Sequence, residues 1–329
     1  MELRQLRSLI ALTECGFNVT QAAEKLHLVQ SAVSQHITRL ETELGVILLN
    51  RQGKRMSGLT SAGEQVLLHA HKTLAETENI LAIGRDFVDE THGTLRIGTT
   101  HTQACYILPP ILRVFRRLYP DVVVQIHQSN PQQLVEMTMK DKVDLSFCTE
   151  ALADHTALTA HSCYRWNRSL IAPKGHPILE QHPLTLALLC KHPIITYVHG
   201  FSGAGRFRNS FARLGLTPKL ALSAADSDVI KTYVREGFGV GIIVSFAYSD
   251  KTDNDLDIKD LSRLFPWEVT SIAYSRDKYL RRYEKHFIEL LQTGIADNGV
   301  SITETKPKTV SNVLETMTAH YSKLPEKID

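Results

Sequence analysis

The sequence lacks long apolar runs and any strong imbalance of charge. No run of about eighteen apolar residues occurs, so neither a transmembrane helix nor a membrane partner is expected. The N-terminus has no basic-then-apolar signal region, which favours a cytoplasmic protein. The net charge of +2 excludes neither nucleic acid nor small anions as partners. With 329 residues, of which 43% are hydrophobic, the chain is long enough for two or three globular domains.

The sequence also lacks the cysteine and histidine spacings that are typical of disulfide frameworks and metal sites. The five cysteines are scattered and odd in number, and no C-x-x-C pair exists. Neither a disulfide framework nor a zinc knuckle is therefore supported. The fifteen histidines include no H-x-x-x-H pair, and His69 and His71 would point to different faces of a helix. We therefore expect no metal and no cofactor.

The segment from Asn18 to Thr60, in contrast, has a residue pattern that is typical of a winged helix-turn-helix. Asn18 can cap a short helix, and Gln21, three positions later, can complete a capping box. A four-residue turn precedes a longer helix predicted at 31–44, which Gly45 should end. The apolar positions of this longer helix step by four, three and four, as one helical face requires, at Val33, Ile37, Leu40 and Leu44.

The polar face of this longer helix and the basic turn after it predict contacts with double-stranded DNA. Short or flexible hydrogen-bonding side chains suit base edges in a major groove, and cations around a turn suit phosphates. The predicted base contacts are Ser31, Ser34, Gln35 and Thr38, with Gln30 beside them. The predicted phosphate contacts are Thr20, Arg51, Lys54 and Arg55. Residues 1–60 hold seven Lys or Arg against five Glu, so a second copy on the duplex would help by adding phosphate contacts. Two short helices joined by a turn also occur in all-α domains that bind no DNA.

A long helix is expected after the wing. Thr60 is its predicted cap, and the sequence continues without proline to about Asp89. Leucine or valine recurs every seven residues, at Leu67, Leu74, Leu81 and Val88. This spacing favours a dimer seam, although Thr77 and Gly84 weaken it; the alternative is a helix that packs on its own chain.

The order of these elements resembles the LysR-type transcriptional regulators over nearly the whole chain. The similar stretches are 22–26, 33–45 and 59–63. Two positions depart from the family pattern: Val29 stands where Ser or Thr usually caps the second helix, and Ser61 stands where Pro is usual. The resemblance implies a DNA-binding regulator that is not an enzyme and that assembles as a homotetramer, a dimer of dimers, with RNA polymerase as a candidate partner.

The second half should be an α/β effector-binding domain with two lobes, like the periplasmic binding proteins. Strands and helices alternate from residue 94 onward, which predicts a parallel, doubly wound sheet. A helix is predicted at 103–119, although Pro109 and Pro110 require it to start later or bend. The expected boundaries are 1–60 for the winged domain, 61–92 for the linker helix, 93–163 with 269–295 for lobe 1, 164–268 for lobe 2, and 296–329 for a tail containing a short helix.

Four blocks narrow the resemblance to the CysB-like, sulfur-assimilation branch of the family. They are 97–104, 149–152, 163–169 and 228–235. The resemblance implies that sulfate-type anions, such as sulfate or thiosulfate, or N-acetylserine or O-acetylserine, act as effectors. It also implies a pocket lined by Thr100, Thr102, Gln103, Thr149, Glu150, Trp166 and Ser202. Ser202 replaces a usual Thr, and Cys105 replaces a usual Arg. A regulator of another pathway that senses a different small organic acid is the alternative.

The expected pocket also has a chemical rationale in the residues. Thr100, Thr102 and Gln103 follow a strand and begin a helix, where free amides and the helix dipole attract anions. Hydroxyls, a side-chain amide and an indole N–H can all donate hydrogen bonds to sulfate. A carboxylate at Glu150 would repel an anion, so it could instead receive an amine or hold a loop.

Two short motifs resemble enzyme signatures without their context. Residues 200–204 are close to the G-x-S-x-G of hydrolases, but position 204 is Ala and His286 is the only histidine downstream before the tail. Residues 237–241 resemble part of a dinucleotide-binding loop but lack the last glycine. We expect the second motif to turn a helix into a strand at 240–244.

Overall fold

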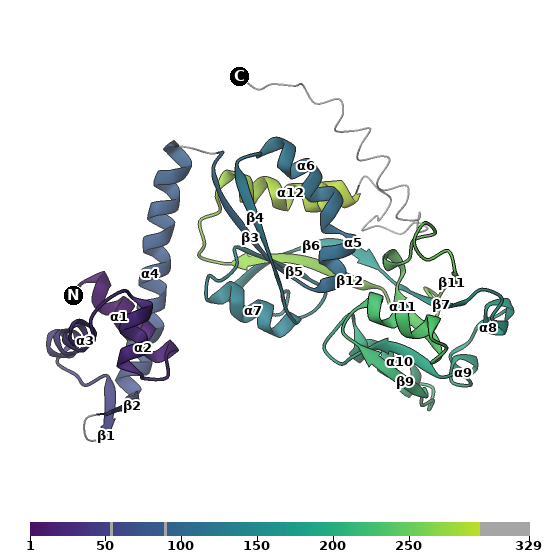
Figure 1. The fold of residues 1–329 in the computed structure, drawn as a ribbon, viewed down its shortest axis with the longest axis horizontal. Helices are drawn as coiled ribbons and strands as arrows, with labels where there is room; N and C mark the ends of the chain where they lie inside the picture. Colours follow the sequence, from purple (N-terminus) through teal and green to yellow (C-terminus); the bar gives the residue numbers. More distant parts are fainter. Residues whose placement is uncertain (53–54, 89–90, 297–329) are drawn as a thin grey trace. The chain divides into compact units, whose positions relative to one another are not determined.

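The computed structural model describes residues 1–52, 55–88 and 91–296, so the tail helix expected beyond 296 lies outside the described residues. The chain divides into two compact units, one of residues 1–88 with 277–279 and one of the remaining residues. Figure 1 shows the helices and strands of the two units, and each unit has its own hydrophobic core.

The first unit is a winged helix-turn-helix followed by a long helix, as predicted. Its helices are α1 (Leu3–Glu14), α2 (Val19–Lys25), α3 (Gln30–Leu44) and α4 (Ser61–Val88), and its wing is the antiparallel pair β1 (Leu49–Gln52) and β2 (Arg55–Leu59). Helix α1 was not predicted, yet it supplies Leu6, Leu9 and Leu12 to the core. Val33, Ile37 and Leu40 of α3 are fully buried, as predicted. Leu44, at the last turn of α3, is 39% exposed, so the buried part of this face ends at Leu40.

The predicted residues Asn18 and Gly45 mark the ends of their helices as expected, and α3 begins without a side-chain cap. The Asn18 side chain accepts hydrogen bonds from the backbone N–H groups of Thr20 and Gln21, so it caps α2 directly. Gly45 ends α3 in the left-handed conformation, with φ of 69°. Val29 precedes α3 without a side-chain cap, as its apolar side chain requires. The first turn of α3 is instead tied to α2, because Gln30 Nε2 donates to Thr20 Oγ1 at 2.7 Å.

The two halves of α4 have different surroundings within the first unit. Ala70 is buried, and Leu67 and Leu74 pack against the same core as the short helices. The alternative expectation, packing on the helix's own chain, therefore holds for this half. Leu81 and Val88 are 49% and 89% exposed. A dimer seam remains a prediction for this second half alone.

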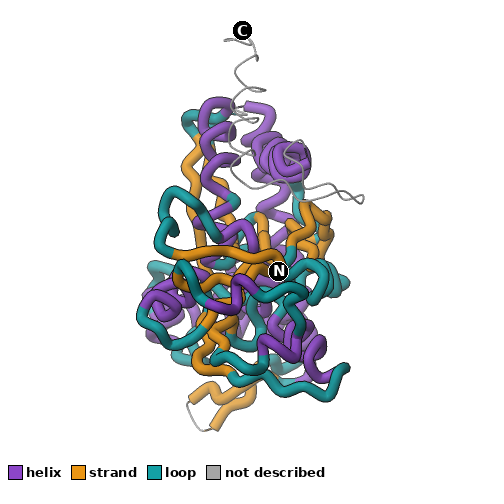
Figure 2. Tube along the Cα trace, turned by 90° about the vertical axis from the view of Figure 1, so that its right-hand side faces the viewer, coloured by secondary structure: helices purple, strands orange, loops and turns teal. Residues whose placement is uncertain are grey.

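The second unit contains two five-stranded sheets, each covered by helices (Figures 1 and 2). The first sheet has the order β4-β3-β5-β12-β6, with β3 (Gly93–Thr99), β4 (Val122–Gln128), β5 (Leu145–Cys148), β6 (Leu158–Trp166) and β12 (Glu268–Ser275). The second has the order β11-β7-β10-β8-β9, with β7 (Arg168–Pro173), β8 (Ile194–Tyr197), β9 (Leu220–Ala224), β10 (Val240–Val244) and β11 (Leu256–Asp260).

The expectation of fully parallel sheets is wrong. Strands β3, β4 and β5 are parallel, but β12 returns from the far end of the sequence and pairs antiparallel with both β5 and β6. In the second sheet β7 pairs antiparallel with β10 and β11. Alternation of strands and helices could not reveal these two strands, because each enters its sheet directly after the chain crosses from the other sheet.

Helices complete the two lobes. They are α5 (His101–Tyr106), α6 (Leu108–Leu118), α7 (Pro131–Met139) and α12 (Arg282–Ala296) in the first lobe, and α8 (Pro177–Glu180), α9 (Leu186–Leu189), α10 (Ala204–Ala212), α11 (Ser227–Arg235) and the 3₁₀ turn η1 (Ser245–Ala247) in the second. The helix predicted at 103–119 is in fact two, broken at Ile107, with Pro109 and Pro110 in the first turn of α6 where proline is tolerated. Gly237 follows α11, and β10 begins at Val240, so the glycine motif at 237–241 is a helix-to-strand turn, as expected.

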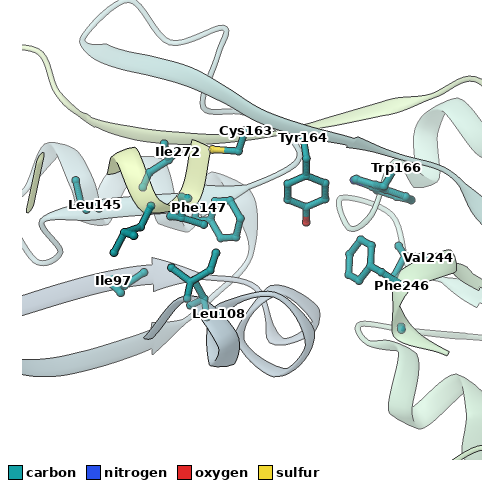
Figure 3. Close-up of a cluster of buried hydrophobic side chains, with 14 of the residues drawn as sticks. Ile97, Leu108, Leu145, Phe147, Cys163, Tyr164, Trp166, Val244, Phe246 and Ile272 are labelled. Atoms are coloured by element: carbon teal, nitrogen blue, oxygen red, sulfur yellow. The ribbon is translucent and has the colours of Figure 1, made fainter. Parts of the chain in front are cut away.

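The chain crosses between the sheets twice. The first crossing is at Asn167, because β6 runs through Trp166, beyond the expected lobe boundary at 163, and β7 begins at Arg168. The second crossing lies between β11 and β12. Aromatic side chains pack across this region, where Tyr164 and Trp166 face Phe246 of η1 with ring centroids 5.9 and 6.2 Å apart (Figure 3).

Two glycines of α4 provide a matched test of the packing in the first unit. A Cβ atom at Gly63 would lie 2.1 Å from the Leu48 carbonyl oxygen, so Gly63→Ala should destabilise the winged domain by about 1–3 kcal/mol. A Cβ atom at Gly84 would meet nothing within 4 Å, so Gly84→Ala should stabilise α4 by about 0.5–1 kcal/mol. Calorimetric unfolding of both variants measures the difference. Equal stability of the two variants would contradict the close approach of α4 to the segment before the wing.

Candidate functional site

The predicted DNA-contact residues of α3 form one accessible face. Gln30, Ser31, Gln35 and Thr38 are exposed, and Ser34 is half-buried. The Thr38 hydroxyl donates to the Ser34 carbonyl oxygen at 3.0 Å, which leaves its methyl group and its oxygen lone pairs for a ligand. Gln30 bonds Thr20, the exposed threonine predicted to contact phosphate, so these two residues form one polar surface at the start of the two helices.

The wing is anchored to α3 through a carboxylate. Glu41 Oε1 accepts the backbone N–H groups of Leu48 and Leu49, at 2.8 and 3.2 Å. Its other oxygen, Oε2, pairs with Arg51 Nη2 at 3.1 Å. The Arg51 side chain is 48% exposed, so its guanidinium can still reach a phosphate from this anchored position. Of the other two predicted cations, Lys54 lies outside the described residues, and the structure places only the backbone of Arg55, in β2.

Three of the predicted effector residues meet in one hydrogen-bonded network. Trp166 Nε1 donates to Thr149 Oγ1 at 3.2 Å. Thr149 Oγ1 lies 3.1 Å from Thr270 Oγ1, which also accepts from Gln103 Nε2 at 3.4 Å. The Tyr164 hydroxyl donates to Gln103 Oε1. Hydroxyl, amide and indole groups that can donate to an anion are therefore collected at one end of the first sheet.

Two members of this network were missed by sequence reasoning. Tyr164 lies inside the block at 163–169, but nothing distinguished its hydroxyl from that of a surface tyrosine. Thr270 lies far along the chain on β12 and reaches the network only because β12 pairs with both β5 and β6. No local pattern could have found Thr270.

Glu150 and Ser202 belong to a second polar cluster, at the loop before α10. The Gly203 N–H donates to Glu150 Oε1, so Glu150 holds this loop, one of the two roles considered for it. Arg168 Nη2 donates to the carbonyl oxygens of Ser202 and Gly203, at 2.8 and 2.9 Å. Ser202 has a φ of +46°, and among the described residues its hydroxyl has no hydrogen-bond partner. The Ser202 side chain is half-buried, and its hydroxyl is available to a ligand.

A buried ion pair lies behind this loop. Arg168 Nη2 and Glu268 Oε1 are 3.1 Å apart, and the two side chains are 1% and 2% exposed. Arg206, which is 62% exposed, approaches the other oxygen of Glu268 at 3.1 Å. Burial lowers the pKa of Arg168 and raises the pKa of Glu150. Within the described part of the chain Arg168 Nη1 has no hydrogen-bond partner, so one buried donor is left over beside the loop.

Thr100 and Thr102 lie at the carboxyl end of β3. Thr100 precedes α5 without a side-chain cap bond, and Thr102 is buried. No hydrogen bond from either hydroxyl to the network is present among the described residues. Their role in a pocket stays a prediction.

The described residues contain no helix that is both long and apolar enough to cross a membrane.

Two family descriptions match the chain. Residues 3–64 match "Bacterial regulatory helix-turn-helix protein, lysR family", and residues 89–296 match "LysR substrate binding domain". The chain is 39% identical over 291 residues to the HTH-type transcriptional regulator CysB of Burkholderia cenocepacia, covering 88% of this chain and 93% of that protein. It is 36% identical over 296 residues to the HTH-type transcriptional regulator Cbl of Escherichia coli, covering 90% of this chain and 94% of that protein.

A solved structure agrees with these matches. The cofactor-binding domain of the Cbl transcriptional regulator superposes with a TM-score of 0.60 at 37% identity, covering 62% of this chain and 90% of that one. This likeness spans the two-lobed unit that holds both polar clusters.

Glu268 pairs with a buried arginine, Arg168, and an exposed one, Arg206, and replacing the buried one should destabilise the protein far more. Arg168→Met removes the buried partner of Glu268 and leaves two loop carbonyl groups without their donor, so we expect a loss of about 3–5 kcal/mol. Arg206→Met removes only an exposed cation and should cost less than about 1 kcal/mol. Denaturant unfolding followed by tryptophan fluorescence measures both. Losses of similar size would mean that the buried pair does not organise the loop.

Proposed function

The chain belongs to the LysR family of bacterial transcriptional regulators, and on that premise we propose that it controls genes of sulfur and cysteine metabolism in response to a small anionic effector. The observation that carries this proposal is the network of Gln103, Thr149 and Trp166 beside the loop at Ser202. These residues stand where the CysB-like resemblance expects effector contacts. The similarity to CysB and Cbl extends over both units, which supports the same class of regulated genes.

For DNA, we propose that α3 reads bases and that the wing holds the backbone. The exposed polar face of α3 has the size and chemistry of a recognition helix. Arg51 is pre-positioned by Glu41, so less side-chain entropy is lost when it meets a phosphate. Among the described residues of this unit, four cations are each paired with a glutamate, at Arg4, Lys25, Arg51 and Arg85, so two or more copies on one duplex would add phosphate contacts. The exposed Leu81 and Val88 of α4 are the proposed seam between copies, within a homotetramer.

For the effector, the chemistry favours an acceptor-only anion such as sulfate or thiosulfate, or an acetylated serine. The Thr149 hydroxyl and the Gln103 amide can exchange their internal hydrogen bonds for bonds to an oxyanion. Arg168 Nη1 adds a buried donor with positive charge nearby. Arg168 and Arg206 are balanced by Glu150 and Glu268, so the cluster is close to neutral before an anion arrives.

Effector binding would act through the position of the two lobes. Glu150 belongs to the first lobe, and the Gly203 N–H that it binds belongs to the second. An anion that contacts both lobes favours the conformation in which they are close. The change in lobe position is the signal that the oligomer passes to its DNA-binding units.

The DNA assignment is tested by separating base contacts from phosphate contacts. Gln35→Ala should change which promoter sequence is preferred, because Gln35 is exposed on the reading face of α3. Arg51→Gln should weaken binding to all sequences alike and reduce the slope of log affinity against log salt by about one. Gel-shift titrations on the promoter and on a scrambled duplex at several salt concentrations measure both effects. A protein that binds all duplexes equally would contradict the proposed recognition face.

The effector assignment is tested with a panel of anions and one carboxylate variant. The wild type should gain thermal stability with sulfate, thiosulfate, N-acetylserine or O-acetylserine. Glu150→Gln keeps an oxygen for the Gly203 N–H and removes a negative charge, so sulfate affinity should rise roughly tenfold, or about 1.4 kcal/mol. Trp166→Phe removes the indole donor and should lower the affinity for sulfate. A response only to other organic acids would favour the alternative, a LysR regulator of a different pathway.

A further inference from the structure

Three side chains with metal-binding atoms converge next to the predicted effector residues of α5. His101 and Cys105 are four residues apart on α5, so they lie on the same face of that helix. Asp228, at the start of α11, approaches them from the second lobe. His101 Nε2 lies 3.0 Å from Asp228 Oδ2 and 3.5 Å from Cys105 Sγ. One ligand atom from each of the three residues lies within 4.8 Å of the others.

Two of the three separations are close to those of a small tetrahedral metal site, and the third, between Cys105 and Asp228, lies within 4.8 Å. Zn²⁺ binds sulfur at about 2.3 Å and nitrogen or oxygen at about 2.0–2.2 Å, which places neighbouring ligand atoms about 3.3–3.7 Å apart. The Sγ–Nε2 separation already matches, and the Nε2–Oδ2 separation is slightly shorter because the two groups are hydrogen bonded. Small side-chain rotations would admit an ion, with the fourth position open to water.

The surroundings hold the carboxylate of Asp228 in place. Its other oxygen, Oδ1, accepts a hydrogen bond from the Tyr106 hydroxyl at 2.5 Å. Lys231 donates to that hydroxyl at 2.9 Å and to Asp253 at 2.9 Å. This outer layer fixes Asp228 so that Oδ2 faces His101. Lys231 is paired with Asp253 at 2.9 Å and also approaches Asp228 Oδ1 at 3.7 Å, so Oδ2 is the Asp228 oxygen left for an ion.

We propose that His101, Cys105 and Asp228 bind a divalent metal ion of the zinc type and thereby link the two lobes. Thiolate, imidazole and carboxylate together are a donor set that suits Zn²⁺. Because two ligands come from α5 and one from α11, a bound ion favours the lobe arrangement in which these helices are close. The site is separate from the Gln103 network, so it is a second input to the regulator.

The site is open to solvent ions. Cys105 is exposed, and Cys105 and Asp228 both line a cavity of about 640 Å³. The same cavity is bordered by Arg235, which is paired with Asp253 and Asp255. An ion therefore has an entry path that does not require the lobes to separate.

Cobalt titration of chelator-treated, full-length protein tests the proposal, because Co²⁺ bound to thiolate absorbs in the near ultraviolet. We expect one Co²⁺ per chain with a thiolate band, displaced by Zn²⁺. Cys105→Ser should abolish the band and lower Zn²⁺ affinity more than about 100-fold, since even outer partners of metal ligands contribute about 10- to 100-fold. His101→Gln and Asp228→Asn should lower affinity while the Cys105 thiol remains. All three residues are at least partly exposed, so folding, checked by circular dichroism, should persist.

Two control variants separate this site from incidental binding. Cys190→Ser removes another partly accessible thiol and should leave the band unchanged. His192→Gln disrupts the pair of His192 and His176, whose rings are 5.5 Å apart, and should leave affinity unchanged. The proposal is overturned by the absence of a thiolate band, by a band that survives Cys105→Ser, or by affinity that is insensitive to Asp228→Asn. None of these results bears on DNA binding or on the anion effector, which are measured separately.

Discussion

The buried pair of Arg168 and Glu268 is the interaction on which the two-lobed unit depends. Arg168 begins the strand that follows the first crossing between sheets, and Glu268 begins the strand that follows the second. Their ion pair therefore ties both crossings together at the hinge. An uncompensated charge there would be costly, because each group is almost fully removed from water. The same arginine also positions the loop of Ser202 and Gly203, so hinge and candidate site share one side chain.

This arrangement gives the hinge a direct connection to ligand chemistry. Polar groups of the first lobe, at Thr149 and Glu150, follow β5, while the Gly203 loop that meets Glu150 is set by Arg168. A ligand that changes the charge or hydrogen bonding of this cluster alters contacts on both sides of the hinge. The convergence of His101 and Cys105 with Asp228 is a second place where the lobes meet through polar groups. Two chemically different inputs can therefore act on one conformational equilibrium.

In the DNA-binding unit, too, one charged side chain serves several contacts. Glu41 is a single carboxylate that satisfies two backbone N–H groups before the wing and also holds Arg51. Wing geometry and a predicted phosphate contact therefore depend on one residue of α3. On the opposite side of α3 from the reading face, Val33, Ile37 and Leu40 are fully buried, so close packing fixes which side of the helix faces outward.

Short-range features of the chain were sufficient for α2, α3 and α4 and for the family, whereas α1 was not predicted. Asn18, Gly45 and Thr60 mark helix ends through contacts a few residues away, and the spacing of Val33, Ile37 and Leu40 identifies the buried face. Such signals are readable because helical hydrogen bonds and side-chain contacts join residues three or four positions apart. The predicted DNA and effector residues followed from those signals together with the resemblance.

Long-range packing decided the rest. The antiparallel entry of β12, the place of Thr270 in the network and the meeting of His101 with Asp228 all join residues more than a hundred positions apart. Strand pairing depends on which distant segment reaches a sheet edge, and a linear pattern does not encode that choice. The partner of Arg51 was hidden for a related reason, since a surface cation looks the same in sequence whether it is free or held by a carboxylate.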